Sequence, residues 1–259
     1  MSDDLGVVGA SVLVFAGAAL GIALLAAAVA GPVRHGIRGL PPVDQAVLLL
    51  AFITAPALAG LALVVLAMAP SLTHLLGFGV DHCHGHGQHG HLCPTHAPLW
   101  TGGSLDWLIL SLVGLGVVYL GADLPRRLLR VRRVVRGLEA LRVPSRESRS
   151  YRVVDVDGPL ALTVGVLRPR VYLSARLLDA LSPAELAAVL GHEQTHCRRR
   201  DALRLLAAEL LSGLHLPLVR RHLLADLNLA TERACDEAAA RGGAGRLGVA
   251  SALLKVARL

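Results

Sequence analysis

The residues best suited to chemistry lie in one short run, Gly191-His192-Glu193-Gln194-Thr195-His196-Cys197. The run contains the spacing H-E-x-x-H and follows a stretch with a helical pattern. On a helix, residues four apart lie on the same face, so His192 and His196 can offer two imidazole nitrogens to one metal ion. Glu193 then lies beside that ion, as the general base of a zinc hydrolase does. The alternative is a polar helix face on which these residues meet by chance.

A zinc hydrolase usually needs three protein ligands and one open position for water. Residues 230–237 form a second helical pattern that offers Glu232 and, one turn later, Asp236. We expect Glu232 to be the third ligand and Asp236 to accept a hydrogen bond from a ligand imidazole. Cys235 could also be a ligand, but a set of two histidines and Cys235 would leave both carboxylates without a role. A further donor for the oxyanion is usually required, and the candidates are Tyr172, His215 and His222.

The helix that carries the two histidines has a clear predicted beginning. Ser182 is an N-cap residue, Pro183 takes the first helical position, and Glu185 completes a capping box. Apolar residues then continue the helical pattern into the H-E-x-x-H run. Both histidines are therefore expected on one continuous helix, which is the structural context that the motif requires.

A small sheet is expected before this helix, from three short strand candidates at residues 151–156, 161–166 and 170–173. Pro169 between the last two suggests an exposed edge. Such an edge could bind an extended peptide by strand addition, or the sheet could be purely structural. Residues 203–219 are apolar enough for a membrane span, but a crossing there would separate Glu232 from the histidines. We expect a helix that is buried in the domain or dips into the membrane surface.

The composition indicates a membrane protein. Of the 259 residues, 54% are hydrophobic, which exceeds the usual apolar share of soluble domains. Three apolar runs are long enough to cross a bilayer, at about residues 5–30, 43–69 and 105–122. The predicted domains are a membrane domain at 1–124, a basic juxtamembrane linker at 125–150 and a zinc metalloprotease domain at 151–259. The predicted fold class is mainly α, with multi-pass transmembrane helices followed by a mostly helical domain with a small β-sheet.

The basic residues predict the orientation in the cell membrane. The link between the first two runs carries Arg34 and Arg38, and the segment after the third carries six arginines between Arg126 and Arg136. Residues 70–104 contain no Lys or Arg. By the positive-inside rule, the N-terminus and loop 70–104 lie outside and the metalloprotease domain is cytoplasmic. The arginine segment has no interleaved aromatic residues, so we expect it to lie on anionic lipid and expect no direct nucleic-acid binding.

The outside loop carries a second group of metal-binding residue types. Its members are His82, Cys83, His84, His86, His89, His91, Cys93 and His96. Imidazole and thiolate ligands together suit zinc, copper or nickel. The frequent glycines argue against one rigid geometry, so loose binding of an extracytoplasmic metal ion is expected. The alternative is a flexible linker with a Cys83–Cys93 disulfide.

The sequence resembles the membrane zinc metallopeptidases of the BlaR/MecR antirepressor type. The likeness of this sequence to that family extends over about residues 124–258 and rests on several motifs in a fixed order. These are residues 165–173, 181–186, 192–196, 200–201, 232–237 and 250–254. Several motifs in a fixed order are far more specific together than H-E-x-x-H alone.

The resemblance implies a gluzincin-like fold, with His192, His196 and Glu232 as zinc ligands and Glu193 as the catalytic base. It also implies cleavage in the cytoplasm of a DNA-binding repressor, or of the protease itself, after an outside signal. The best-known members continue through a fourth span into an external penicillin-binding sensor domain, whereas this sequence stops at Leu259. We therefore expect a short form without β-lactam sensing, for which a metal ion at the His-rich loop is the replacement signal.

Two other functions are open at this point. The first is a non-catalytic metal sensor or carrier that uses the His-rich loop, with H-E-x-x-H as a structural site. The intact Glu193 argues against it, because a structural zinc site needs no base. The second is a membrane scaffold that binds a transcription factor without cutting it. Both predict that Glu193→Gln leaves function unchanged.

Overall fold

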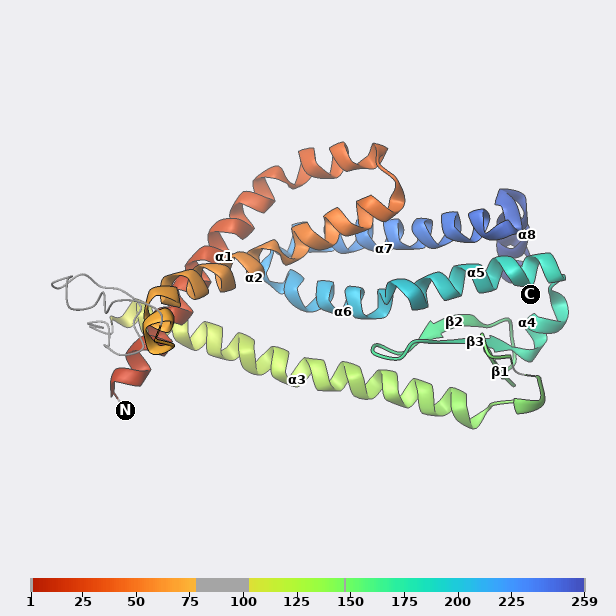
Figure 1. The fold of residues 1–259 in the computed structure, drawn as a ribbon, viewed down its shortest axis with the longest axis horizontal. Helices are drawn as coiled ribbons and strands as arrows, with labels where there is room; N and C mark the ends of the chain where they lie inside the picture. Colours follow the sequence, from red (N-terminus) through yellow and green to blue (C-terminus); the bar gives the residue numbers. More distant parts are fainter. Residues whose placement is uncertain (1, 78–102, 147, 259) are drawn as a thin grey trace. The chain divides into compact units, whose positions relative to one another are not determined.

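The computed structural model describes residues 2–77, 103–146 and 148–258, and it is mostly helical (Figure 1). The elements before the sheet are α1 (Ser2–Gly36), η1 (Ile37–Gly39), α2 (Pro42–Leu75), α3 (Ser104–Ala140) and η3 (Pro144–Arg146). The sheet and the following elements are β1 (Arg152–Val154), β2 (Ala161–Val164), β3 (Arg170–Ser174), α4 (Ala175–Ala180), α5 (Pro183–Arg199), α6 (Asp201–Leu211), η4 (Ser212–Leu214), α7 (Pro217–Ala239), η5 (Ala240–Ala244) and α8 (Gly245–Arg258). The mainly α fold class with a small sheet is confirmed. The expected metal ligands between His82 and His96 lie outside the described residues.

The chain forms two compact units. The first contains Met1–His35, Ala51–Ala122 and Leu211–Arg220, and the second contains Gly36–Leu50, Asp123–Leu210 and Arg221–Leu259. Within the described part of the chain, three helical segments are long and apolar enough to cross a membrane: Val7–Gly39, Pro42–Ala69 and Trp107–Ala140. All three expected apolar runs are therefore helical. The third helix continues without a break to Ala140, so the first part of the expected basic linker is helical.

Close packing in the first unit depends on small residues. A Cβ on Gly60 would lie 2.8 Å from Cδ2 and 3.0 Å from the carbonyl oxygen of Phe15, so α1 and α2 can approach here only because Gly60 has no side chain.

His215 is buried against α2, where its Nε2 lies 3.0 Å from the carbonyl oxygen of Ile53 and its ring stacks on Phe52. Residues 203–219 do not form the single helix that we expected, because the chain leaves α6, passes through η4 and starts α7 at Pro217.

In the second unit, the sheet has the strand order β1-β3-β2. β3 pairs in parallel with β1 and antiparallel with β2. The interpretation of Pro169 as the mark of an exposed edge is therefore wrong for β3, which is the central strand. Pro169 lies in the turn just before β3, where its missing N–H breaks no strand pairing. The edge strands are β1 and β2, and residues 141–143 hydrogen-bond to the segment of β1. β2 ends at Val164, and Gly165 follows it with φ 119°.

One face of this sheet packs against the helix that carries the H-E-x-x-H run. The buried core here consists of Val171, Leu173, Leu177 and Leu181. Tyr151, Ala161, Leu186, Val189, Leu190, Cys197 and Val256 pack against it. Burial of this apolar area holds α5, α8 and the sheet together, so the helix with the H-E-x-x-H run lies on a well-packed support.

Helix α5 begins and ends at defined residues. The predicted capping box is present, since Ser182 Oγ accepts from the Glu185 N–H and Glu185 Oε2 accepts from the Ser182 N–H. The helix ends at Arg199, and the cap residue Arg200 adopts the left-handed conformation with φ 54° and ψ 44°. A left-handed residue after the last turn stops the helix and redirects the chain. Asp201, the first residue of α6, is thereby turned back toward α5.

Candidate metal centre

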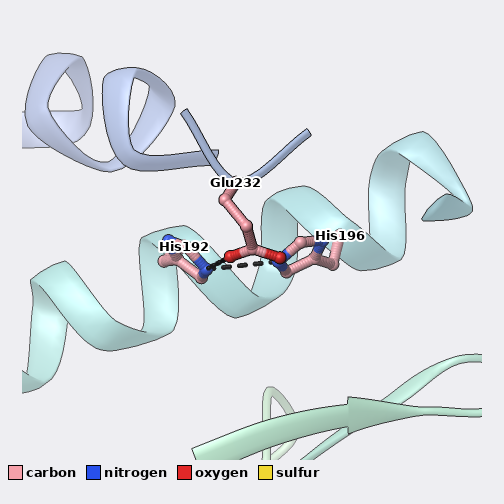
Figure 2. A group of neighbouring side chains, drawn as sticks. All are labelled: His192, His196 and Glu232. Carbon is pink, nitrogen blue, oxygen red and sulfur yellow. Dashed lines mark hydrogen bonds and ion pairs between the residues drawn. The ribbon is translucent and has the colours of Figure 1, made fainter. Parts of the chain in front are cut away.

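Two imidazoles face one another on α5 (Figure 2). The Nε2 atoms of His192 and His196 lie 3.1 Å apart. Two nitrogens bound at 2.0–2.1 Å to a tetrahedral zinc ion would be about 3.3 Å apart. The spacing of four residues along α5 therefore produces the separation that one shared metal ion requires.

Glu232 on α7 completes the group. Its carboxylate points at both rings (Figure 2), with Oε2 3.4 Å from His192 Nε2 and Oε1 3.7 Å from His196 Nε2. These three ligand atoms all lie within 4.8 Å of one another. Helix α7 comes close to α5 beside the motif, because Gly191 has no side chain: a Cβ there would lie 3.3 Å from the Cα of Ala239. The three residues expected to bind zinc are thus brought together from two helices.

Both imidazoles are held from behind by carboxylates. His192 Nδ1 lies 2.9 Å from Asp236 Oδ1, and His196 Nδ1 lies 3.0 Å from Asp201 Oδ2. A carboxylate on Nδ1 fixes the ring and leaves Nε2 free to bind a metal ion. The helical spacing predicts this type of contact for Asp236 but not for Asp201. Its only signal in the sequence was its place in the Arg200-Asp201 part of the family resemblance.

Asp201 is the more deeply buried of these two carboxylates. It is 2% exposed, and its Oδ1 lies 3.2 Å from Arg199 Nε and 3.9 Å from Arg204 Nη1. Two guanidinium groups thus compensate its charge in the interior. The Asp236 side chain is 39% exposed, so water competes for its hydrogen bond to His192.

Cys235, the alternative ligand, lies on the other side of His196. Its buried Sγ is 3.4 Å from His196 Nδ1 and 3.7 Å from Asp201 Oδ2. His196, Asp201 and Cys235 form a second group with metal-ligand atoms close together. This group contains only one of the two motif histidines and uses the nitrogen that already faces Asp201. Glu232, by contrast, lies near both Nε2 atoms.

Glu193 is directed toward the edge strand of the sheet. It is 8% exposed, and the hydroxyl of Thr163 on β2 lies 2.7 Å from its Oε2 and 2.9 Å from its backbone oxygen. The hydroxyl has one proton, so it can donate to one of these oxygens at a time. Thr163 restrains the expected base, and sequence reasoning missed it because the two residues belong to different elements.

The carboxylates around the two imidazoles shift the pKa values of the site. Burial lowers the pKa of His196, but its hydrogen bonds to Asp201, Cys235 and Glu232 outweigh burial and raise the pKa to about 12. Burial also lowers the pKa of His192, and the hydrogen bond to Glu232 overcomes this effect, so the net shift is upward. The same contacts with the two histidines hold the pKa of the Glu232 carboxyl well below its usual range. The carboxylates around the two rings thus favour a positive charge between them.

The candidates for an oxyanion donor are placed differently. Tyr172 is fully buried and donates its hydroxyl to Glu139 Oε1 at 2.7 Å, so this donor is already engaged. His215 belongs to the first unit and contacts Ile53. His222 lies exposed on α7. None of these three contacts the metal-ligand group through a hydrogen bond that the structure records.

Comparison with known proteins agrees with the geometry. Protease HtpX homolog 2 of Methanosarcina mazei is 31% identical over 99 residues, which cover 34% of this chain and 34% of that protein. The match thus spans about a third of the relative's length. No solved structure matches. The sequence profile of the BlaR1 peptidase M56 family matches residues 105–258. The chain therefore belongs to the BlaR1 peptidase M56 family, as the resemblance implied.

Proposed function

We propose that the protein is a membrane-bound zinc-dependent endopeptidase that cleaves a cytoplasmic protein after an extracytoplasmic signal. The observation that supports this most is the convergence of His192, His196 and Glu232 on one point, with a carboxylate behind each imidazole. Two imidazoles and one carboxylate are the donor set of many catalytic zinc sites, and they leave a fourth position open.

In the proposed mechanism, bound zinc would act as a Lewis acid that polarises the scissile carbonyl and makes water more acidic. Glu193 takes a proton from the attacking water and delivers it to the leaving amine. Thr163 holds the Glu193 side chain in place, and its hydroxyl would compete with that water for the carboxylate. Asp201 and Asp236 keep the two imidazoles in the tautomer with Nδ1–H.

The location and the signal are proposals that rest on the sequence. The arginines between α1 and α2 and in the second half of α3 support a cytoplasmic metalloprotease domain, with the N-terminus and loop 70–104 outside. The substrate would be a DNA-binding repressor or the protease itself, as in the antirepressor proteins that the sequence resembles. A metal ion at residues 82–96 would be the signal, because this outside segment carries six histidines and two cysteines.

The test uses the full-length protein in lipid nanodiscs, with zinc content and cleavage measured on the same samples. We expect about one zinc per chain in the native protein and in Glu193→Gln. Peptide cleavage should fall by about 10²- to 10⁴-fold in this variant, because the general base is lost. Glu232→Gln should lose zinc as well as cleavage. Glu237→Gln, on the exposed part of α7, is the matched control and should behave like the native chain.

The outcomes separate this function from its rivals. Equal cleavage by the native protein and Glu193→Gln would refute the proposal. Zinc binding without any cleavage would favour a metal sensor or carrier. For the signal, deletion of residues 82–96 should abolish a response to added zinc and leave basal cleavage intact. A zinc response that survives this deletion would rule out the loop as the sensor.

A further inference from the structure

A cavity of about 510 Å³ lies within the second unit, between α5 and one end of the sheet. Three segments that are far apart in the sequence form its wall. They are residues 148–152, which lead into β1, residues 169–171 at the start of β3, and part of α5. Cavities of about 300–1,000 Å³ are typical of small-molecule sites, so the size of this one suits a small ligand.

The wall of this cavity is strongly basic. Four arginines line it: Arg149, Arg152, Arg170 and Arg198. None of the described residues that line it is acidic. Arg149, Arg170 and Arg198 are exposed, so their guanidinium groups are accessible to a ligand from solution. A concave surface lined by one sign of charge attracts ligands of the opposite sign, and this cavity should therefore attract anions.

A carboxylate beside the cavity, Glu139 on α3, is shared by three guanidinium groups. Its Oε1 lies 3.3 Å from Arg170 Nη1 and 3.6 Å from Arg152 Nε. Its Oε2 accepts a hydrogen bond of 2.9 Å from Arg142 Nη1. One carboxylate can compensate only one of these three positive charges. Glu139 thus positions arginines of the wall without neutralising the cluster.

The cavity is separate from the side of α5 that faces the candidate metal centre. Gln194 and Arg198 line the cavity, and each follows a motif histidine by two residues. Two residues correspond to a rotation of about 200° around an α-helix. The cavity therefore lies away from the imidazoles of His192 and His196, which face Glu232. An anion in this cavity would be a ligand in its own right.

The residue types of the wall favour phosphate groups. A guanidinium carries five N–H donors in a planar fork, which binds phosphate oxygens in pairs. Arg198 donates from Nη2 to Thr195 Oγ1 at 2.8 Å, so its side chain is held beside α5 while other donors remain for a ligand. Ser148 and Ser150 add hydroxyl groups to the wall. Donors that converge on one hollow from three segments suit a compact anion with several oxygens.

We propose that this cavity binds an anion that carries one or more phosphate groups. The candidate ligands and base of the metal centre do not line it, so the proposal stands apart from the proposed endopeptidase function. A soluble phosphate compound and a phospholipid headgroup both present this chemistry, and the experiment distinguishes these two sources.

The experiment is isothermal titration calorimetry of the full-length protein in phosphatidylcholine nanodiscs, with pyrophosphate as the probe. We expect one site with a Kd of about 1 mM or tighter, as several charge-assisted hydrogen bonds would give. Arg149→Gln and Arg198→Gln should each weaken binding by about 10-fold, because each removes one such bond. Arg176→Gln, exposed on α4 and outside the cavity, removes the same charge and is the matched control.

The native protein and the arginine variants decide whether the cavity is the site. No binding by the native protein would overturn the proposal. Unchanged affinity in Arg149→Gln and Arg198→Gln, or an equal loss in Arg176→Gln, would also overturn it. Glu232→Gln should bind pyrophosphate as the native protein does. If binding is lost in Glu232→Gln and kept in both cavity variants, the anion binds at the metal centre and the proposal is wrong.

Two further arms identify the ligand. Tighter binding of a hexaglutamate peptide than of pyrophosphate would indicate an acidic protein segment and would overturn the proposal. In nanodiscs that also contain phosphatidylglycerol, unchanged affinity for pyrophosphate would support a soluble phosphate compound. An affinity at least about 10-fold weaker in these nanodiscs, absent from Arg149→Gln, would support a lipid headgroup that competes for the same cavity.

Discussion

The contact between Asp201 and His196 provides a sharp test of how the metal site is held. Asp201→Asn keeps the size of the side chain and one carbonyl oxygen that can accept from Nδ1, but removes the negative charge. In the native chain this oxygen lies 3.0 Å from His196 Nδ1, and the carboxylate is 2% exposed. Because solvent does not screen a group buried to this extent, we expect the charge to matter more here than at the half-exposed Asp236.

The size of the effect follows from the type of hydrogen bond that is changed. A hydrogen bond to a charged group contributes about 1.5–3 kcal/mol and a neutral one about 0.5–1.5 kcal/mol. The loss of charge at Asp201 should therefore cost about 1–1.5 kcal/mol, which is roughly a tenfold weaker zinc affinity. Asp201→Ala leaves Nδ1 without an acceptor and should weaken zinc binding by up to about 100-fold.

The assay is competition for zinc between the protein in nanodiscs and a chromophoric chelator, with thermal unfolding measured in parallel. Thermal unfolding is measured because the Asp201 substitutions also remove the carboxylate partner of Arg199. A loss of folding stability can thus be told apart from a loss of zinc affinity. Asp157→Asn, in an exposed turn, is the matched control, and Asp236→Asn should have a smaller effect than Asp201→Asn. Native zinc affinity in both Asp201 variants would show that this carboxylate does not position His196, and the reasoning would be wrong.

Three further predictions concern other contacts of the second unit. Thr163→Val removes the hydroxyl 2.7 Å from Glu193 Oε2 and should lower kcat by about 10- to 100-fold, the cost of one hydrogen bond to a charged group, with zinc content unchanged. Gly191→Ala places a Cβ 3.3 Å from the backbone of α7; we expect a loss of about 1 kcal/mol in thermal unfolding, because overpacking outweighs the gain in helix propensity. The Glu185 carboxyl has a pKa of about 2, below its ordinary 4.5, first because Lys255 donates to it. Its stabilisation of α8 should therefore be complete above about pH 4.5 and decline as the pH falls toward 2, measured by hydrogen exchange of α8 amides.

Each of these predictions has its own control. Thr163→Ser keeps the hydroxyl and should restore most of the activity that Thr163→Val loses, whereas equal losses would indicate a packing effect. Gly137→Ala, in α3 with nothing within 4 Å of the added Cβ, should not destabilise the protein. Glu185→Gln should make α8 exchange faster at pH 7 and remove the dependence on pH. If α8 exchanges equally in both proteins across this range, the Glu185 contact does not hold it.

Local features of this protein followed from the sequence because they depend on periodicity and on adjacent residues. Ser182 and Glu185 form the expected capping box, since both partners lie within one turn of the chain. His192 and His196 face one another because a spacing of four residues on a helix places them on one face. The same argument put Asp236 one turn after Glu232, and the apolar runs predicted the three long helices from their length.

Contacts between distant segments were decided by the tertiary structure alone. Pro169 indicated an edge strand, but pairing on both sides makes β3 central, because strand order depends on which segments fold back together. The partner of Glu193 is Thr163, thirty residues earlier, and nothing in the spacing of these two residues links them.

The contact between Asp201 and His196 is the clearest case of a contact that the sequence could not predict. Asp201 reaches His196 because Arg200 adopts a left-handed conformation, which is uncommon for a residue other than glycine and cannot be inferred from its type. The contacts of Ser251 and Lys255 on α8 with Glu185 on α5 likewise join segments that are far apart in the sequence. The sequence by itself thus determined which residues could bind a metal ion, since these lie at helical spacings. Only the packing of α5, α6, α7, α8 and the sheet decided what holds those residues and what surrounds them, because such contacts join segments that no local periodicity relates.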